Sequence, residues 1–216
     1  MIFKDRADAG RQLAGKLASY KDTGAQVLAL PRGGVPVAFE IARALRAPLD
    51  VFVVRKLGVP GHVELAMGAI ASGGVRVLNE DTLAELSIDE ATLHAVTQGE
   101  LAELQRRENV YRGGSPAPQV SERTVILIDD GLATGASMYA AVLALRALSP
   151  SKIVVAVPVA PTDTCANIAR YVDEMVCAAT PDPFGGVGAW YGDFRQVSDD
   201  EVRDMLRSAR EWSHTP

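Results

Sequence analysis

Two acids followed by a loop of small residues stand out in the segment VILIDDGLATGAS, residues 125–137. The apolar residues before the acids predict a buried strand, which Asp129 and Asp130 follow directly. In an open α/β sheet, ligands bind outside the carboxyl ends of the strands, so we expect both carboxylates at a binding edge. Carboxylate oxygens accept hydrogen bonds, and the hydroxyl groups of a sugar donate them. The pair therefore indicates a site for a sugar diol.

The loop after the acids has the composition of a phosphate-binding turn. Its residues lack bulk, so their backbone N–H groups can approach an anion, and the helix that follows adds its positive end. The residues predicted to bind phosphate are Gly131, Ala133, Thr134, Gly135, Ala136 and Ser137. A phosphate site beside two acids fits ribose 5-phosphate. A tight strand–helix turn is the alternative, whereas the absence of a P-loop lysine and of GxGxxG disfavours nucleoside triphosphates and dinucleotides.

A second strand–turn–helix unit occupies residues 28–42, LALPRGGVPVAFEIA. Gly33 and Gly34 leave backbone donors accessible, and Arg32 can add charge-assisted hydrogen bonds to an anion. We expect this turn to be a second anion-binding element, the alternative being a plain glycine turn with a solvated arginine.

Residues 50–58, DVFVVRKLG, predict a strand that ends in Arg55 and Lys56 at the same edge of the sheet. Two cations there would neutralise the negative charge of an anionic group bound at that edge. Charged residues just past a strand are usually solvated, so a surface role is the alternative.

Apolar runs that alternate with amphipathic stretches must position these groups. The predicted strands are residues 27–30, 50–54, 75–78, 124–128, 152–158 and 174–179. The predicted helices are residues 4–20, 35–45, 87–111, 137–148, 162–172 and 198–212. This alternation predicts an α/β fold, a parallel twisted sheet with helices on both faces, and the apolar run 124–128 predicts its central strand.

One segment departs from that alternation. Two extended stretches flank Gly73 and Gly74, which predicts a projecting β-hairpin flap at about residues 57–80. A long helix at about residues 87–112 follows the flap. Ser87-x-x-Glu90 fits a capping box at the start of that helix.

Glycine and aromatic residues mark the segment PDPFGGVGAWYGDF, residues 181–194, and predict a small C-terminal hood at about residues 180–197. Phe184, Trp190 and Tyr191 could form an aromatic wall against a planar base. The alternative is that these rings pack the final helix against the sheet.

Composition excludes several classes of function. The formal net charge of the 216 residues is −5, so no basic field attracts nucleic acid or an anionic membrane. No apolar run is long enough to span a bilayer, and the N-terminus is too polar for a signal peptide. Cys165 and Cys177 are predicted to be free core residues in a reducing cytoplasm. We expect a cytoplasmic protein with one domain over residues 1–216.

The segment VILIDDGLATGAS resembles the phosphoribosyl pyrophosphate signature of type I phosphoribosyltransferases. The resemblance covers roughly residues 25–180 and implies that the turn at residues 32–34 holds pyrophosphate. It also implies that the flap closes over the reacting ribose and excludes water, which makes His62 and Glu64 candidate acid–base groups. A passive exposed histidine is the alternative for His62.

In the hood, the segment is similar to the one that covers the base in purine phosphoribosyltransferases. That similarity implies that Phe184 stacks on the base and that Asp193 reaches Mg²⁺. Two positions depart from hypoxanthine-type members, which have an aspartate at Ala133 and a lysine at Ala136. Phosphate binding tolerates both changes, but the general acid–base route to N7 of a purine is absent. The whole chain most resembles uncharacterised bacterial phosphoribosyltransferase-like proteins with no assigned acceptor.

The expected activity is Mg²⁺-dependent transfer of a 5-phosphoribosyl group from phosphoribosyl pyrophosphate to a nitrogenous base or similar acceptor, with release of pyrophosphate, in nucleotide metabolism. The candidate catalytic residues are Asp129, Asp130, Arg55, Lys56 and Glu64. Two alternatives stay open: a catalytically silent phosphoribosyl pyrophosphate sensor that regulates a partner, and a phosphohydrolase whose acid pair binds metal. The resemblance is also compatible with a homodimer, which is common in the family.

Overall fold

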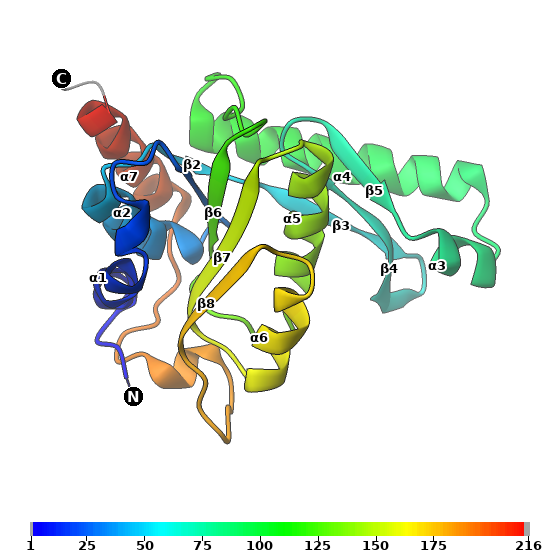
Figure 1. Ribbon diagram of the computed structural model, residues 1–216. Coiled ribbons are helices and arrows are strands. Elements are labelled where there is room, and N and C mark those ends of the chain that lie inside the picture. Colours follow the sequence, from blue (N-terminus) through cyan, green and yellow to red (C-terminus); the bar gives the residue numbers. More distant parts are fainter. Residues whose placement is uncertain (1, 214–216) are drawn as a thin grey trace.

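Five parallel strands form the central sheet of the computed structural model, which describes residues 2–213 except for the side chains at positions 63, 64 and 213 (Figure 1). Their order across the sheet is β2 (Leu49–Val51), β1 (Gln26–Ala29), β6 (Thr124–Ile128), β7 (Lys152–Val159) and β8 (Glu174–Ala179). The apolar run 124–128 is therefore the middle strand, as its composition predicts.

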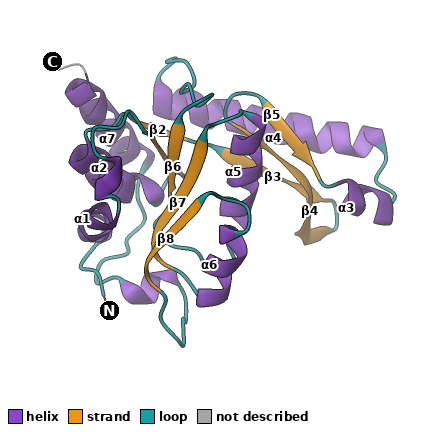
Figure 2. Cartoon of the chain, in the orientation of Figure 1, coloured by secondary structure: helices purple, strands orange, loops and turns teal. Residues whose placement is uncertain are grey.

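Helices cover both faces of this sheet (Figure 2). On one face lie α1 (Arg6–Lys16), α2 (Gly34–Leu45) and α7 (Asp199–Ser213), and on the other α5 (Ala136–Ala147) and α6 (Thr162–Ala169). Successive side chains of β6 point to opposite faces, so Ile126 belongs to one apolar core and Leu127 to the other. Each is completely buried and contributes about 1.5–3 kcal/mol to folding. The predicted α/β architecture is confirmed.

A second, antiparallel sheet projects away from the first one (Figure 1). It consists of β3 (Val54–Val59), β4 (His62–Ala71) and β5 (Val75–Leu78), and the hairpin predicted at Gly73 and Gly74 joins the last two. The short α3 (Glu80–Glu85) and the long α4 (Glu90–Arg112) follow. The flap is thus a three-stranded sheet rather than a single hairpin.

The predicted strand 50–54 is wrong, because the chain passes from one sheet to the other within it. Phe52 and Val53 link β2 to β3 and are both buried. The Phe52 amide donates to the Ala29 carbonyl at 2.9 Å, whereas the Val53 amide donates to Ser72 Oγ at 2.9 Å. Since the link is as apolar as the strands beside it, the sequence DVFVV hides the boundary.

The predicted capping box at the start of the long helix is also wrong. Asp89 is the N-cap, and its side chain accepts a hydrogen bond from the Thr92 amide at 2.7 Å. Ser87 adopts a left-handed turn conformation with φ of 49° ahead of the helix. An aspartate cap satisfies the same orphan donors, so the helix begins two residues later than the serine indicates.

Cys165 and Cys177 are joined by a disulfide, which contradicts the prediction of two free thiols. Cys165 lies in α6 and Cys177 in β8, and α6 folds back beside that strand. The bond therefore ties the helix to the edge of the central sheet.

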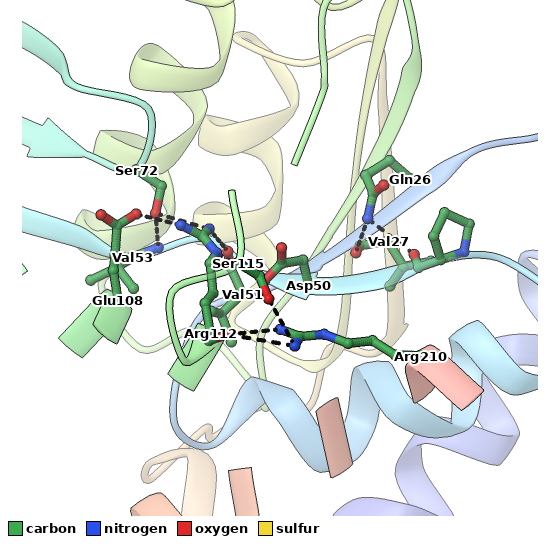
Figure 3. Close-up of polar contacts among 11 residues, drawn as sticks. Gln26, Val27, Asp50, Val51, Val53, Ser72, Glu108, Arg112, Ser115 and Arg210 are labelled. Carbon is green, nitrogen blue, oxygen red and sulfur yellow. Dashed lines mark hydrogen bonds and ion pairs between the residues drawn. The ribbon is translucent and has the colours of Figure 1, made fainter. Parts of the chain in front are cut away.

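Arg112 anchors the end of α4 to the central sheet (Figure 3). Its guanidinium is buried and pairs with Asp50 at 3.1 Å and Glu108 at 2.5 Å, while Nη2 donates to the Val51 carbonyl at 2.7 Å. From α7, Arg210 donates to Ser115 Oγ at 3.1 Å just past the end of α4. These contacts hold the last turns of α4 against β2 and α7.

Candidate functional site

The predicted acids and the predicted anion-binding turn meet where β1 and β6 end side by side. The two strands pair in parallel up to Ala29 and Ile128, and the Leu30 amide donates to the Ile128 carbonyl at 2.9 Å. Beyond that bond, the chain continues into residues 31–34 on one strand and into Asp129 and Asp130 on the other. Segments about 100 residues apart in sequence therefore form one edge, as expected for the carboxyl ends of parallel strands.

The glycine turn packs directly on the acids. A Cβ atom at Gly33 would lie 2.0 Å from Asp130 Oδ2, and one at Gly34 would lie 2.8 Å from the Ile128 carbonyl oxygen. Only glycine fits at these two positions, because any side chain would overlap the acids or their strand. Arg32 points away from them, and its Nη1 lies 3.7 Å from Asp199 Oδ1 at the start of α7.

Asp130 is held by Arg6 from the first turn of α1. Arg6 Nε lies 2.7 Å from Asp130 Oδ2, and the two side chains are only 10% and 15% exposed. The same guanidinium donates to the Arg195 carbonyl at 2.8 Å and lies 3.9 Å from the centre of the Phe194 ring. The N-terminal helix and the C-terminal hood thus hold the second acid together.

The two carboxyl groups have raised pKa values for related reasons. Burial and the negative charge of Asp130 raise the pKa of Asp129 well above its ordinary value. Burial also raises the pKa of Asp130, although the hydrogen bond and charge of Arg6 oppose that rise. Because the two acids are neighbours, they titrate as a pair, and the pair retains a proton at a higher pH than isolated aspartates do.

The predicted phosphate loop, residues 131–137, has backbone donors with no acceptor of their own. Within residues 2–213, the amides of Ala133, Thr134, Gly135 and Ser137 donate no hydrogen bond to the chain. The Ala136 amide makes only a long contact of 3.4 Å with Thr134 Oγ1. Both hydroxyl-bearing residues, Thr134 and Ser137, are exposed at the start of α5. This arrangement fits an oxyanion.

Glycines and α6 set the shape of the loop. Gly131 has φ of 155°, and a Cβ there would lie 2.6 Å from Val187 Cγ1 of the hood. Gly135 has φ of 77°, and a Cβ there would lie 3.0 Å from Thr164 Cγ2 of α6. Thr164 also donates to the Ala133 carbonyl at 3.0 Å, so that carbonyl already has a partner in α6. Left-handed backbone favours glycine at both places.

The cations predicted beside this edge both belong to β3 of the second sheet and not to a strand of the central sheet. Arg55 pairs with Glu100 of α4 at 2.6 Å, so their position at the end of a central strand was predicted wrongly. Lys56 lines a cavity of about 550 Å³ between the second sheet and α5, which Ala136 of the phosphate loop also lines. The side chain of Glu64 lies outside the described residues, while the backbone of His62 begins β4.

The aromatic residues of the hood pack against each other and against the N-terminus. Tyr191 is buried beside Phe3, and its hydroxyl donates to the Asp130 carbonyl at 2.5 Å. Trp190 is the last residue of the short 3₁₀ helix η2 (Val187–Trp190), and its Nε1 donates to the Phe184 carbonyl at 2.8 Å. Asp193 is 59% exposed and accepts a hydrogen bond from the Arg195 amide at 3.0 Å. The sequence does not predict the two N-terminal partners of this region, Phe3 beside Tyr191 and Arg6 beside Asp130.

Comparison with known proteins places this chain in a family. The sequence model described as the phosphoribosyl transferase domain matches residues 2–188. Two Mycobacterium tuberculosis proteins, from strains CDC 1551 and H37Rv, are each 52% identical over 208 residues, which is 96% of this chain. Their names assign them provisionally to the phosphoribosyl transferases. The alignment covers 47% of their length, so this chain spans about half of these relatives.

A solved structure extends the similarity to the whole described fold. The crystal structure of TT1426 from Thermus thermophilus is 41% identical in sequence and has a TM-score of 0.88. The match covers 99% of this chain and 100% of that chain. The projecting second sheet and the long helix α4 thus fall within the matched part of the chain. None of the helices described is long and apolar enough to cross a membrane.

Proposed function

Since the chain belongs to the phosphoribosyl transferase domain family, we propose that it transfers a 5-phosphoribosyl group from phosphoribosyl pyrophosphate to a nitrogenous acceptor and releases pyrophosphate. The observation that carries this proposal is that the amides of Ala133, Thr134, Gly135 and Ser137, beside two acids, donate no hydrogen bond within the described residues. Amides that can bind an oxyanion, beside carboxylates that can accept hydrogen bonds from hydroxyl groups, match the chemistry of a sugar phosphate.

Each part of the edge has a role in the proposed reaction. The amides and hydroxyls of residues 131–137 bind the 5-phosphate, and Asp129 and Asp130 accept hydrogen bonds from the ribose hydroxyls. The turn at residues 32–34 binds the pyrophosphate as it leaves C1. Catalysis then rests on positioning and on stabilising the departing negative charge.

Mg²⁺ fits this site as a cation that enters with the substrate. Among the described residues, no group of three or more acidic, histidine or cysteine side chains could form a metal cage. Mg²⁺ usually keeps several waters and binds through one or two carboxylates and substrate phosphates. We propose Asp193 as the carboxylate that reaches it, and the bound ion would neutralise pyrophosphate charge.

A sensor that binds phosphoribosyl pyrophosphate without turnover is the second candidate. One observation favours it: Ala133 is exposed in the phosphate loop, so no titratable side chain stands there to exchange a proton with a base. Glu64 and His62 of the flap are the proposed sources of a proton in the enzyme. The two candidates share the ligand and differ only in turnover.

Ser137→Asp tests the phosphate site without disturbing the core. Ser137 is exposed in the first turn of α5, where an acid suits the helix but repels a phosphate. Ser151→Asp makes the same charge change at the opposite, amino edge of the sheet. We expect calorimetric titration with ribose 5-phosphate to show at least a tenfold loss for Ser137→Asp alone. Equal affinity in both variants would refute the phosphate site.

Turnover then separates the candidates. The wild-type protein is incubated with phosphoribosyl pyrophosphate, Mg²⁺ and a panel of nucleobases, and pyrophosphate and phosphate are measured. Pyrophosphate release that depends on a base supports the transferase, whereas binding without release supports the sensor. Release of phosphate instead would favour a hydrolase.

A further inference from the structure

A polar cavity of about 370 Å³ lies on the outer side of the 31–34 turn, between α4 and the start of α7. Its lining consists of Pro31, Arg32, Arg106, Arg107, Tyr111 and Asp199. Three arginines from two distant segments surround one cavity in a protein whose overall charge is negative. Such a local excess of guanidinium groups is typical of phosphate recognition.

Glu103 pre-arranges two of the arginines. Its carboxylate accepts from Arg106 Nε at 2.7 Å and Nη2 at 3.0 Å, and from Arg107 Nε at 2.7 Å. These hydrogen bonds lower the pKa of Glu103 to about 2, so it stays ionised and keeps both guanidinium groups in place. Fixed guanidinium groups lose less conformational freedom when they bind an anion.

The cavity retains hydrogen-bond donors that no acceptor uses. In the described part of the chain, the terminal nitrogens of Arg107 donate no hydrogen bond, and Arg32 has only the 3.7 Å ion pair with Asp199. Tyr111 donates to Asp199 at 2.9 Å. Burial and Asp199 raise the pKa of Tyr111 to about 12, so the phenol stays a neutral donor. Three cations face two carboxylates here, which leaves a positive excess for an anion.

We propose that this cavity binds a phosphate or pyrophosphate group, with Arg106 and Arg107 of α4 as its main ligands. The proposal deepens the proposed function and rests on it, because it assigns residues of the long helix to an anion site beside the pyrophosphate turn. Arg112 fixes the adjacent turn of α4 to β2 (Figure 3), which gives the two arginines a rigid support. The bound group belongs either to phosphoribosyl pyrophosphate or to a second phosphorylated molecule.

Inorganic pyrophosphate is the probe. Titration calorimetry compares the wild type with Arg106→Ala/Arg107→Ala and with Arg43→Ala/Arg46→Ala, which removes the same charge at the far end of α2. All four side chains are exposed or half-exposed, so both variants should fold, and circular dichroism checks this. We expect at least a tenfold loss of pyrophosphate affinity in the α4 variant and less than a twofold change in the α2 variant. Affinity within twofold of wild type in the α4 variant would overturn the proposal.

Two further titrations identify the source of the anion and separate this proposal from the proposed function. Ribose 5-phosphate should bind the α4 variant normally, because it occupies residues 131–137. Failure of the wild type to bind ribose 5-phosphate would refute the proposed function but leave the pyrophosphate result standing. If the α4 variant loses affinity for phosphoribosyl pyrophosphate as well as for pyrophosphate, the cavity binds the pyrophosphate group of phosphoribosyl pyrophosphate. If pyrophosphate still binds in saturating phosphoribosyl pyrophosphate, the cavity serves a second molecule.

Discussion

The ion pair between Arg6 and Asp130 allows the effect of Arg6→Ala to be worked out from the structure. The pair spans 2.7 Å, and with side chains only 10% and 15% exposed, alanine would leave Asp130 with little access to water. Removing one partner of a buried pair costs about 3–5 kcal/mol, and the remaining exposure favours the lower end, about 3 kcal/mol. Loss of the guanidinium over Phe194 adds about 1 kcal/mol. At about 2–4 °C per kcal/mol for a domain of this size, Tm should fall by about 8–16 °C.

This loss must depend on pH, and its sign follows from the pKa of Asp130. Burial already raises that pKa, and Arg6 opposes the rise. Without Arg6, the folded-state pKa moves further above the unfolded value of about 4, so the protonated carboxyl favours the folded state. The destabilisation should therefore be smallest near pH 4 and should grow as pH rises through the folded-state pKa.

Differential scanning calorimetry from pH 4.5 to 8.5 measures both effects. Arg11→Ala is the matched control, because Arg11 lies on the same helix, is 52% exposed and forms only ion pairs of 3.6 and 3.9 Å. That variant should change stability by no more than about 0.5 kcal/mol at any pH. Equal losses in the two variants, or a loss for Arg6→Ala that is independent of pH, would refute the reasoning.

Two further predictions concern buried charge. Asp129→Asn should raise Tm at pH 8 by about 2–6 °C and weaken ribose 5-phosphate binding, because burial and Asp130 oppose ionisation of Asp129. Calorimetry should show that this gain in Tm disappears toward pH 4. A gain in Tm that is the same at every pH would show that ionisation of Asp129 is not its cause. Arg112→Met should lower the free energy of unfolding in urea by about 3–5 kcal/mol, since it leaves Asp50 buried without its partner. Adding Asp50→Asn should recover part of the lost free energy of unfolding. If nothing is recovered, the loss comes from packing and not from the unpaired charge.

The strand and turn at residues 124–137 are predictable from the sequence because their features are local. The apolar run, the acids and the small residues lie within residues 125–137, and the strand occupies residues 124–128 as predicted. The strands at residues 75–78 and 174–179 also have their predicted bounds, since turn residues flank clear apolar runs. Local patterns suffice wherever strand, turn and helix follow one another directly.

Contacts between distant segments leave no comparable pattern. Arg6 is 124 residues from Asp130 in sequence, and nothing in RADAG distinguishes this arginine from the solvated Arg11 five residues later. The disulfide is hidden for a similar reason. Cys165 and Cys177 are 12 residues apart with no recognisable spacing, and they meet only because α6 folds back along β8.

The predicted position of Arg55 and Lys56 is wrong for a different reason. An apolar run shows that a strand is buried, but it does not show to which sheet the strand belongs. Here the run continues through Phe52 and Val53 into a second sheet, so both cations lie along β3 and Arg55 faces α4. Two guanidinium groups that do lie beside the 31–34 turn, Arg106 and Arg107, come from the long helix α4, for which the sequence predicts no role in the site.

The charges at this edge make sense only when they are considered together. Phosphoribosyl pyrophosphate carries an anion at each end of its sugar, and two ionised acids beneath the sugar would repel both. Arg6 of α1 neutralises the charge of Asp130, and the raised pKa of Asp129 limits the negative charge on Asp129. In the proposed function, the neutral amides within residues 131–137 and the cationic cavity beside Arg32 would bind one anion each. A pair of acids is compatible with two anions because the surrounding chain has already balanced its charge.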